Sequence, residues 1–80
     1  MQTEFASAKH VVGIKQSKRA LADGTAKSAY IARNADPAIT EPFAQLCEEK
    51  GVEVIYADTM EELGRACGIN VGAAVAVLTK

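Results

Sequence analysis

Helical and extended patterns alternate along the whole chain, and this alternation constrains the fold more than any other feature of the sequence. Four short apolar runs have the character of strands, and they are Val11–Val12, Ala29–Ala32, Val52–Tyr56 and Val71–Leu78. The segments between them have helical spacing, and a further short helix is expected over Thr3–Lys9. Alternation of this kind is typical of a sheet that lies between layers of helices. The sequence therefore predicts an α/β fold, a three-layer α/β/α sandwich with a four-stranded mixed sheet.

Capping residues indicate where two of the helices begin. Asp36 is a predicted N-cap, because Pro37 after it suits the first helical turn. Thr40 is an alternative cap for the same helix, since Pro42 also tolerates a position near a helix start. Thr59 and Glu62 have the spacing of a capping box, in which each satisfies a backbone donor of the other.

Glycines mark the expected helix ends. Gly24 follows a helix that is expected from about Gln16 to Ala22, and Gly51 follows the helix that begins near Asp36. Gly68 follows a helix that runs to Cys67. Each glycine lies where a left-handed residue commonly terminates a helix.

The length and composition predict one ordered domain over residues 1–80. Eighty residues are enough for a single folded domain, and 49% hydrophobic with 24% charged residues is outside the disordered range. The sequence has no apolar run long enough to span a membrane and no secretory signal pattern at its start, so we expect a cytoplasmic protein without a membrane partner.

The two cysteines, Cys47 and Cys67, fall in apolar helical patterns, where buried free thiols are common. A disulfide and a thiol-redox role remain the alternatives, and the latter requires exposure and a low thiol pKa. With His10 as the sole histidine, a zinc site is poorly supplied with ligands. No cofactor is expected.

The net charge of −1 conceals an uneven distribution. Residues 1–33 hold six cations and two acids, a net charge of +4, whereas residues 34–80 hold three cations and eight acids, a net charge of −5. Binding of an anionic partner depends on the local field rather than on the total charge.

The positive charge is concentrated at the start of the helix over residues 16–22. At 3.6 residues per turn, Lys15, Lys18, Arg19 and Ala22 share one face. Ile14, Ser17 and Leu21 fall on another face, where Leu21 and Ile14 are expected to anchor the helix to the sheet. Cations near a helix N-terminus oppose the helix dipole, so they suggest a function in binding anions rather than in stability. A solvated charged face is the simpler alternative.

Two neighbours of these cations favour nucleic-acid recognition over simple solvation. The amide of Gln16 offers a donor and an acceptor, and Lys15 can donate to guanine O6 and N7. Gly13 has no side chain and lets another molecule approach the backbone closely. No GKS or GKT follows a glycine loop, which excludes a P-loop.

A second candidate segment is the short loop Ile69-Asn70-Val71, which lies between glycines. We expect Gly64 to allow close packing within a helix, Gly68 to cap that helix and Gly72 to stand at the entry of a strand. The two apolar loop side chains dock on the core or, alternatively, contact unstacked bases of irregular RNA.

The motifs GIKQSKRAL, SAYIARNADP, VEVIYAD and LGRACGINVGAAVAV occur in this order from about Phe5 to Leu78. Together they resemble the kink-turn-binding ribosomal protein family, which includes the archaeal L-seven-Ae and eukaryotic L-thirty types. The resemblance implies binding to the kink-turn, an RNA internal loop with tandem sheared G·A pairs beside a sharp bend. It implies structured RNA as the partner, with the ribosome as one candidate, and we expect the protein to be a monomer.

The resemblance also implies roles for individual residues. Gly13 would permit close approach, Lys15 and Gln16 would contact the guanines, and Arg19 would take the last basic position. The loop Ile69–Val71 would pack against the flipped-out nucleotide. The full candidate RNA-binding set is Gly13, Ile14, Lys15, Gln16, Lys18, Arg19, Ile69, Asn70 and Val71.

This chain departs from the family pattern at two places. Archaeal members usually have Asn-Glu where Lys15-Gln16 stands, and Lys-Gln resembles the bacterial and eukaryotic L-thirty branch. Many members have glutamate where Asn70 stands, so the base preference of the loop stays open.

The sequence leaves two alternatives to RNA binding. A protein-interaction module of the same fold would use the acidic second half, including Glu61 and Glu62, to dock a basic partner. An enzyme is disfavoured, because no Ser/His/Asp or Cys/His arrangement is recognisable and His10 has no evident carboxylate partner.

Overall fold

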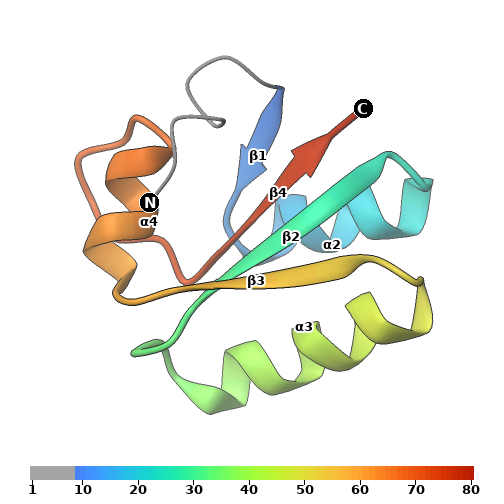
Figure 1. The fold of residues 1–80 in the computed structure, drawn as a ribbon, viewed down its shortest axis with the longest axis horizontal. Helices are drawn as coiled ribbons and strands as arrows, with labels where there is room; N and C mark the ends of the chain where they lie inside the picture. The colour runs from blue at the N-terminus through green and yellow to red at the C-terminus, as the bar shows by residue number, and fades with distance from the viewer. Residues whose placement is uncertain (1–8) are drawn as a thin grey trace.

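Four strands form one mixed sheet in the computed structural model, which describes residues 9–80 (Figure 1). The strands are β1 (His10–Val12), β2 (Ala26–Ala32), β3 (Glu53–Ala57) and β4 (Val75–Thr79). Their order across the sheet is β1-β4-β2-β3. β4 pairs antiparallel with β1 and with β2, whereas β2 and β3 are parallel.

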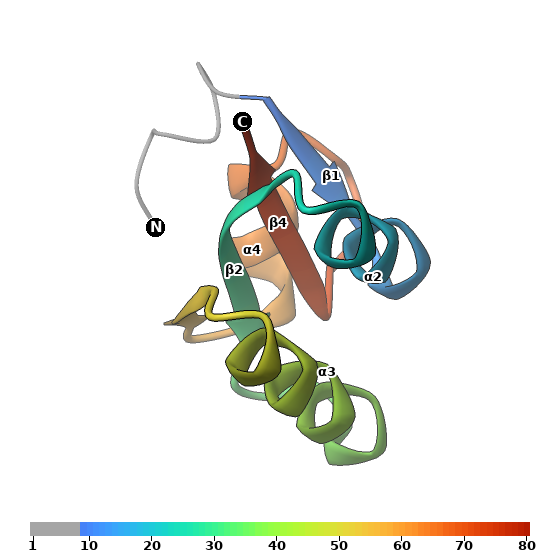
Figure 2. The ribbon, with the colours of Figure 1, turned by 90° about the vertical axis from the view of Figure 1, so that its right-hand side faces the viewer.

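Helices cover both faces of this sheet (Figures 1 and 2). α2 (Ile14–Asp23) and α3 (Pro37–Glu49) cover one face, where Leu21, Phe43 and Cys47 pack on the central strands. α4 (Met60–Ala66) covers the other face through Leu63. The predicted sandwich with a four-stranded mixed sheet is thus confirmed. The helix expected over Thr3–Lys9 lies, apart from its last residue, outside the described residues.

The starts of α3 and α4 carry the predicted N-cap residues, Asp36 and Thr59. The Asp36 carboxylate accepts a hydrogen bond from the Ala38 N–H at 2.9 Å, and Thr40 lies inside the helix, so Asp36 is the cap. The hydroxyl of Thr59 accepts from the Glu62 N–H at 3.0 Å. α2 differs from the prediction by beginning at Ile14, two residues earlier than Gln16.

The last strand is shorter than the sequence predicts. An apolar run over Val71–Leu78 suggested a strand of that length, but β4 begins only at Val75. The Ala73 N–H donates to the Met60 carbonyl at 3.0 Å, and Gly72 packs against the Met60 side chain. The backbone before β4 is therefore bonded to α4 rather than to a strand, and Gly72 belongs to a loop instead of a strand entry.

Two properties of the described residues bear on membrane and metal binding. None of the helices is both long and apolar enough to cross a bilayer. Across residues 9–80, no three His, Cys, Asp or Glu side chains come together in a way that could hold a metal ion.

Candidate functional site

The start of α2 is shaped by Gly13, which follows β1 directly. Its N–H donates to the Val75 carbonyl at 3.0 Å, and its carbonyl accepts from the Ser17 N–H at 2.9 Å. Its φ of 97° is in the region that side chains rarely adopt. No atom lies within 4 Å of the place that a Cβ would occupy. The backbone at this point is therefore open to another molecule.

The faces of α2 are divided as the helical spacing predicts. The side chains of Lys15, Gln16, Lys18 and Arg19 are all exposed. The buried side consists of Ser17, Ala20 and Leu21, with Ile14 half-buried against the core that α2 shares with α3. One helix face thus anchors the element while the other presents polar groups to solvent.

The electrostatics of this helix start are unbalanced. α2 has no acidic residue in its first turn, and no side chain caps its first N–H groups. Within the part of the chain that the structure describes, Lys15, Lys18 and Arg19 make no ion pair. Unpaired N–H groups, the positive end of the helix dipole and three cations therefore add to one positive potential. Such a surface attracts phosphate.

The segment between α4 and β4 is held tightly on α4. Gly68, with φ of 81°, ends the helix, and the Ile69 N–H donates to the Gly64 carbonyl at 3.0 Å. A Cβ at Gly64 would collide with the carbonyl oxygen of Val71. Gly64 therefore has the close-packing role that the sequence suggested, with the loop backbone as the packing partner.

The two apolar residues of this loop have different environments. Ile69 is half-buried and packs on the core beneath α4, whereas Val71 is 69% exposed and Asn70 is also exposed. Docking on the core therefore describes Ile69 but not Val71.

The loop and α4 border a shallow cleft of about 300 Å³. Its lining consists of Glu61, Arg65, Ile69, Asn70, Val71 and Gly72. Arg65 was absent from the candidate set, and Glu61 was considered only as part of an acidic docking face. Their spacing of four residues is the signal that places both on one side of α4.

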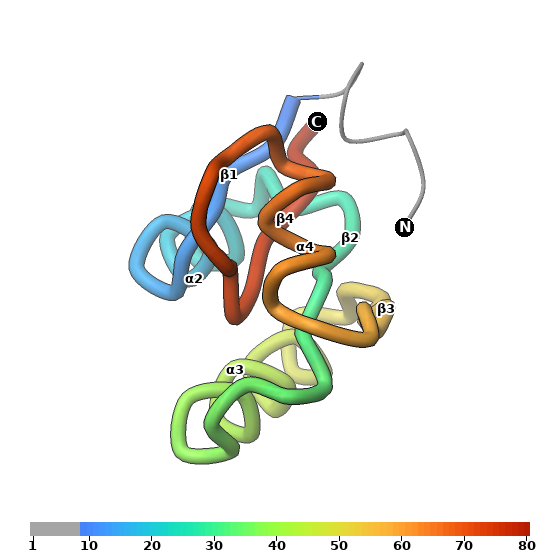
Figure 3. Tube along the Cα trace, turned by 90° about the vertical axis from the view of Figure 1, so that its left-hand side faces the viewer, coloured from blue at the N-terminus to red at the C-terminus, as the bar shows by residue number. Residues whose placement is uncertain are grey.

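The β1–α2 junction and the loop lie at the same end of the sheet (Figure 3). Val12 pairs with Ala76, and the Gly13 N–H reaches the Val75 carbonyl, so α2 starts where the loop enters β4. His10 Nε2 lies 3.2 Å from the Cys67 carbonyl oxygen, which makes the ring nitrogen the donor and ties β1 to the end of α4. The sheet thus places the two candidate segments on one side of the molecule.

Both cysteines are buried free thiols, as the sequence predicts. Burial raises the pKa of Cys47 and of Cys67 from 9.0 to about 11. A redox or nucleophilic thiol needs the opposite shift. The thiol chemistry considered as an alternative is therefore unsupported.

Comparison with known protein families gives a match over almost the entire chain. The family described as ribosomal protein L7Ae/L30e/S12e/Gadd45 matches residues 2–80. An RNA-binding protein of Caldanaerobacter subterraneus subsp. tengcongensis is 47% identical over 68 residues, which cover 85% of this chain and 83% of the relative. The RNA-binding protein YbxF of Geobacillus stearothermophilus is 45% identical over 71 residues, covering 88% of this chain and 87% of YbxF.

More distant proteins share the sequence pattern and the fold. Large ribosomal subunit protein eL8 of Halobacterium salinarum is 34% identical over 67 residues, which cover 82% of this chain and 56% of eL8. Among solved structures, the Giardia lamblia 15.5kD RNA binding protein superimposes with a TM-score of 0.86 at 32% identity. That superposition covers 98% of this chain and 67% of the Giardia protein.

Proposed function

Because the chain belongs to the ribosomal protein L7Ae/L30e/S12e/Gadd45 family, we propose that it recognises and stabilises RNA kink-turns. Family members are RNA-binding, ribosomal-type proteins and not enzymes, which confirms the expectation of a non-catalytic RNA-binding protein. The proposal goes further than RNA binding in general, because it names the RNA element and the residues that contact it.

The observation that carries the proposal is the unneutralised, exposed face at the start of α2. Lys15 and Gln16 project beside Gly13, where the backbone has open space in front of it. Sheared G·A pairs present guanine edges in a widened groove, and a lysine with an adjacent amide suits those edges. Lys18 and Arg19 follow on the same helix face and contact the phosphates that converge at the bend.

The loop supplies the second contact in this proposal. Val71 is largely exposed, and the cleft beside it is bordered by Arg65. RNA-binding proteins commonly hold splayed bases on apolar side chains and on guanidinium planes. A nucleotide expelled from the bend packs here, with Ile69 and Asn70 forming the wall.

A gel-shift titration tests the proposal with two RNAs. One contains a kink-turn, and the other has both G·A pairs replaced by Watson–Crick pairs. We expect clearly tighter binding to the first, with one protein copy per kink-turn measured by analytical ultracentrifugation. Equal affinity for the two RNAs would rule the proposal out.

A second set of variants separates this function from protein docking by the acidic half of the chain. Charge reversal of Glu62, which does not line the cleft, should leave discrimination between the two RNAs intact, whereas replacing Lys15 and Gln16 should abolish it. The reverse pattern would indicate a protein-interaction module instead.

A further inference from the structure

The outer edge of β3 carries backbone groups that are available for pairing. β3 is last in the strand order, and β2 pairs with one side of it. The Ala57 carbonyl accepts from the Arg33 N–H at 2.8 Å, so the peptide groups of Ala57 point toward β2. Because these groups alternate along a strand, those of Val54 and Tyr56 point to the opposite side. No strand of the described range, residues 9–80, lies on that side.

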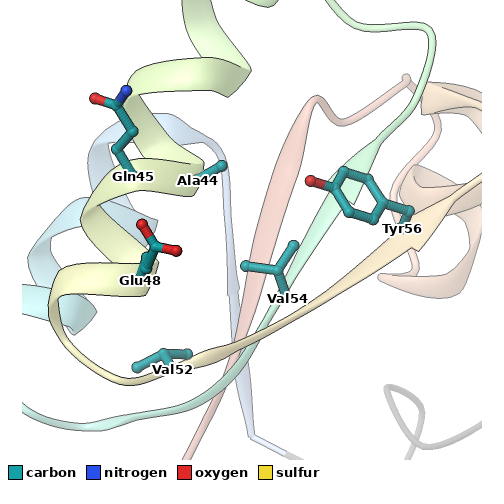
Figure 4. A pocket seen from close by; sticks show the side chains of 6 residues that line it. All are labelled: Ala44, Gln45, Glu48, Val52, Val54 and Tyr56. Carbon is teal, nitrogen blue, oxygen red and sulfur yellow. The ribbon is translucent and has the colours of Figure 1, made fainter.

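A groove of about 360 Å³ runs along the same edge, between β3 and α3 (Figure 4). Residues Ala44, Gln45, Glu48, Val52, Val54 and Tyr56 line it. In Figure 4 the side chains of Val54 and Tyr56 reach from β3 toward the side of α3. Tyr56 is 49% exposed, so its ring is accessible from the groove. An apolar floor thus lies beside an unpaired strand edge.

The charge along this groove is negative. Glu48 is the charged residue of the lining, and Glu41 lies seven positions earlier on the same side of α3. A cation is already present at the far end, where the Arg33 guanidinium lies 5.2 Å from the centre of the Tyr56 ring. Its charge is balanced by Asp58, whose carboxylate is 3.9 Å from Arg33 Nε. The tyrosine face thus accepts a guanidinium, while the acid at the middle of the groove has no cation beside it among the lining residues.

We propose that this groove binds an extended, basic segment of a partner protein, which adds a strand to the edge of β3. The segment bonds through its backbone to the peptide groups of Val54 and Tyr56. The side chains on one face of the added strand lie over the floor at Ala44 and Val54, and one of them, a lysine or arginine, reaches Glu48. RNA does not fit this surface, because an acidic lining repels phosphate. A second copy of the chain would place two acidic α3 faces along one interface.

The groove is independent of the RNA-binding proposal. β1, which leads into α2, lies at one edge of the sheet, and β3 lies at the other. A partner on β3 therefore leaves the start of α2 free, so the protein can hold an RNA and a basic protein segment at once.

Nuclear magnetic resonance tests the proposal with the folded chain and a short peptide that carries valine and lysine in turn at every second position, with serine between them, so that both face the groove. We expect saturable shifts of the Val54 and Tyr56 amide signals, with slower hydrogen exchange at these two amides as they become bonded. The amide signals of Lys15 and Gln16 should not move. The same peptide with glutamate in place of each lysine is the matched control and should not bind.

Two charge reversals on α3 supply a matched pair of variants. Glu48→Lys should weaken peptide binding by roughly tenfold or more, because an attraction becomes a repulsion. Glu49→Lys makes the same charge change on an exposed neighbour outside the groove and should leave the affinity near that of the parent. Unchanged binding of kink-turn RNA, or an unchanged thermal midpoint, confirms that both variants are folded.

Four results would overturn the proposal. They are equal binding of the acidic peptide, equal effects of the two reversals, shifts confined to other surfaces, and peptide-independent dimerisation through β3. Failure of RNA binding alone would leave the groove proposal standing, because its measurements do not use RNA.

Discussion

Gln16 lies between two lysines on an exposed helix face, and its amide is the group in this cluster that can both donate and accept. Under the proposed function, Gln16→Ala should lower the affinity for a kink-turn by about 1–3 kcal/mol and relax the preference for G·A pairs. Titration of the G·A and Watson–Crick RNAs measures both quantities.

Lys18→Ala is the matched control for that measurement. A phosphate contact does not depend on the base, so its loss should weaken the binding of both RNAs equally. The slope of log affinity against log salt concentration should fall by about 1. A Gln16 variant that behaves in the same way as the Lys18 variant would contradict a role in base recognition.

Ser17 has a fully buried hydroxyl that finds no hydrogen-bond partner among the described residues. An unsatisfied buried hydroxyl costs about 1–3 kcal/mol, so Ser17→Ala should hold or raise stability, with a gain of up to about 1 kcal/mol. Because the side chain faces the core, RNA binding should be unchanged. Thermal unfolding checks this, and a clear fall in the melting temperature would mean that the hydroxyl is bonded.

At the scale of the element, α4 and the loop after it form one unit through Gly64. Alanine normally favours a helix over glycine by about 1 kcal/mol. Here the added methyl would meet the Val71 carbonyl, and overpacking of this kind costs about 1–3 kcal/mol. Gly64→Ala should therefore destabilise the protein in urea unfolding.

The same substitution should weaken RNA binding although Gly64 is buried. The loop must move away from α4 to make room, which displaces Val71. Ala66→Gly, in the same helix, is a control that removes a methyl instead of adding one, and it should cost stability without moving the loop. Unchanged stability of Gly64→Ala would show that the loop yields freely.

The buried thiols of α3 and the end of α4 link stability to pH. Their pKa values of about 11 exceed the ordinary 9.0, so the folded state retains protons that the unfolded state loses. The stabilisation is complete below pH 9 and is lost as the pH rises through 11. Each pKa unit corresponds to about 1.4 kcal/mol, so the loss is on the order of a few kcal/mol.

Urea unfolding across this pH range measures the effect. The double variant C47A/C67A should show a flatter pH dependence than the parent, whatever its absolute stability. Native thiols should also react slowly with a labelling reagent at pH 8. Rapid labelling of the folded protein would contradict the burial on which this prediction rests.

At the scale of the whole molecule, local patterns predicted the sandwich and the faces of α2. Helical spacing separated Lys15 from Leu21, and short-range chemistry placed the caps at Asp36 and Thr59. The predicted start of β4 at Val71 was wrong, because residues 71–74 have the same apolar character as the strand itself. These residues stay outside the strand because the Ala73 N–H bonds to the Met60 carbonyl. This is a tertiary contact that the local sequence does not indicate.

The groove beside β3 shows the same limit. The apolar run over residues 52–56 predicts a strand, but nothing in it indicates whether that strand is central or at an edge. The position follows from strand order, which depends on the pairing of distant segments. The start of α2 and the loop before β4 also come together through the pairing of distant segments. Local patterns do not predict this proximity, and only the family resemblance implied it.

The strand order also bears on how the chain reaches its fold during synthesis. β4 is the last strand along the sequence, yet it lies inside the sheet between β1 and β2. Until residues 75–79 emerge from the ribosome, β1 has no neighbour and Gly13 has no carbonyl to bond. Pairing of such distant segments is slow to form. The start of α2 therefore takes its final position only after residues 75–79 have been translated.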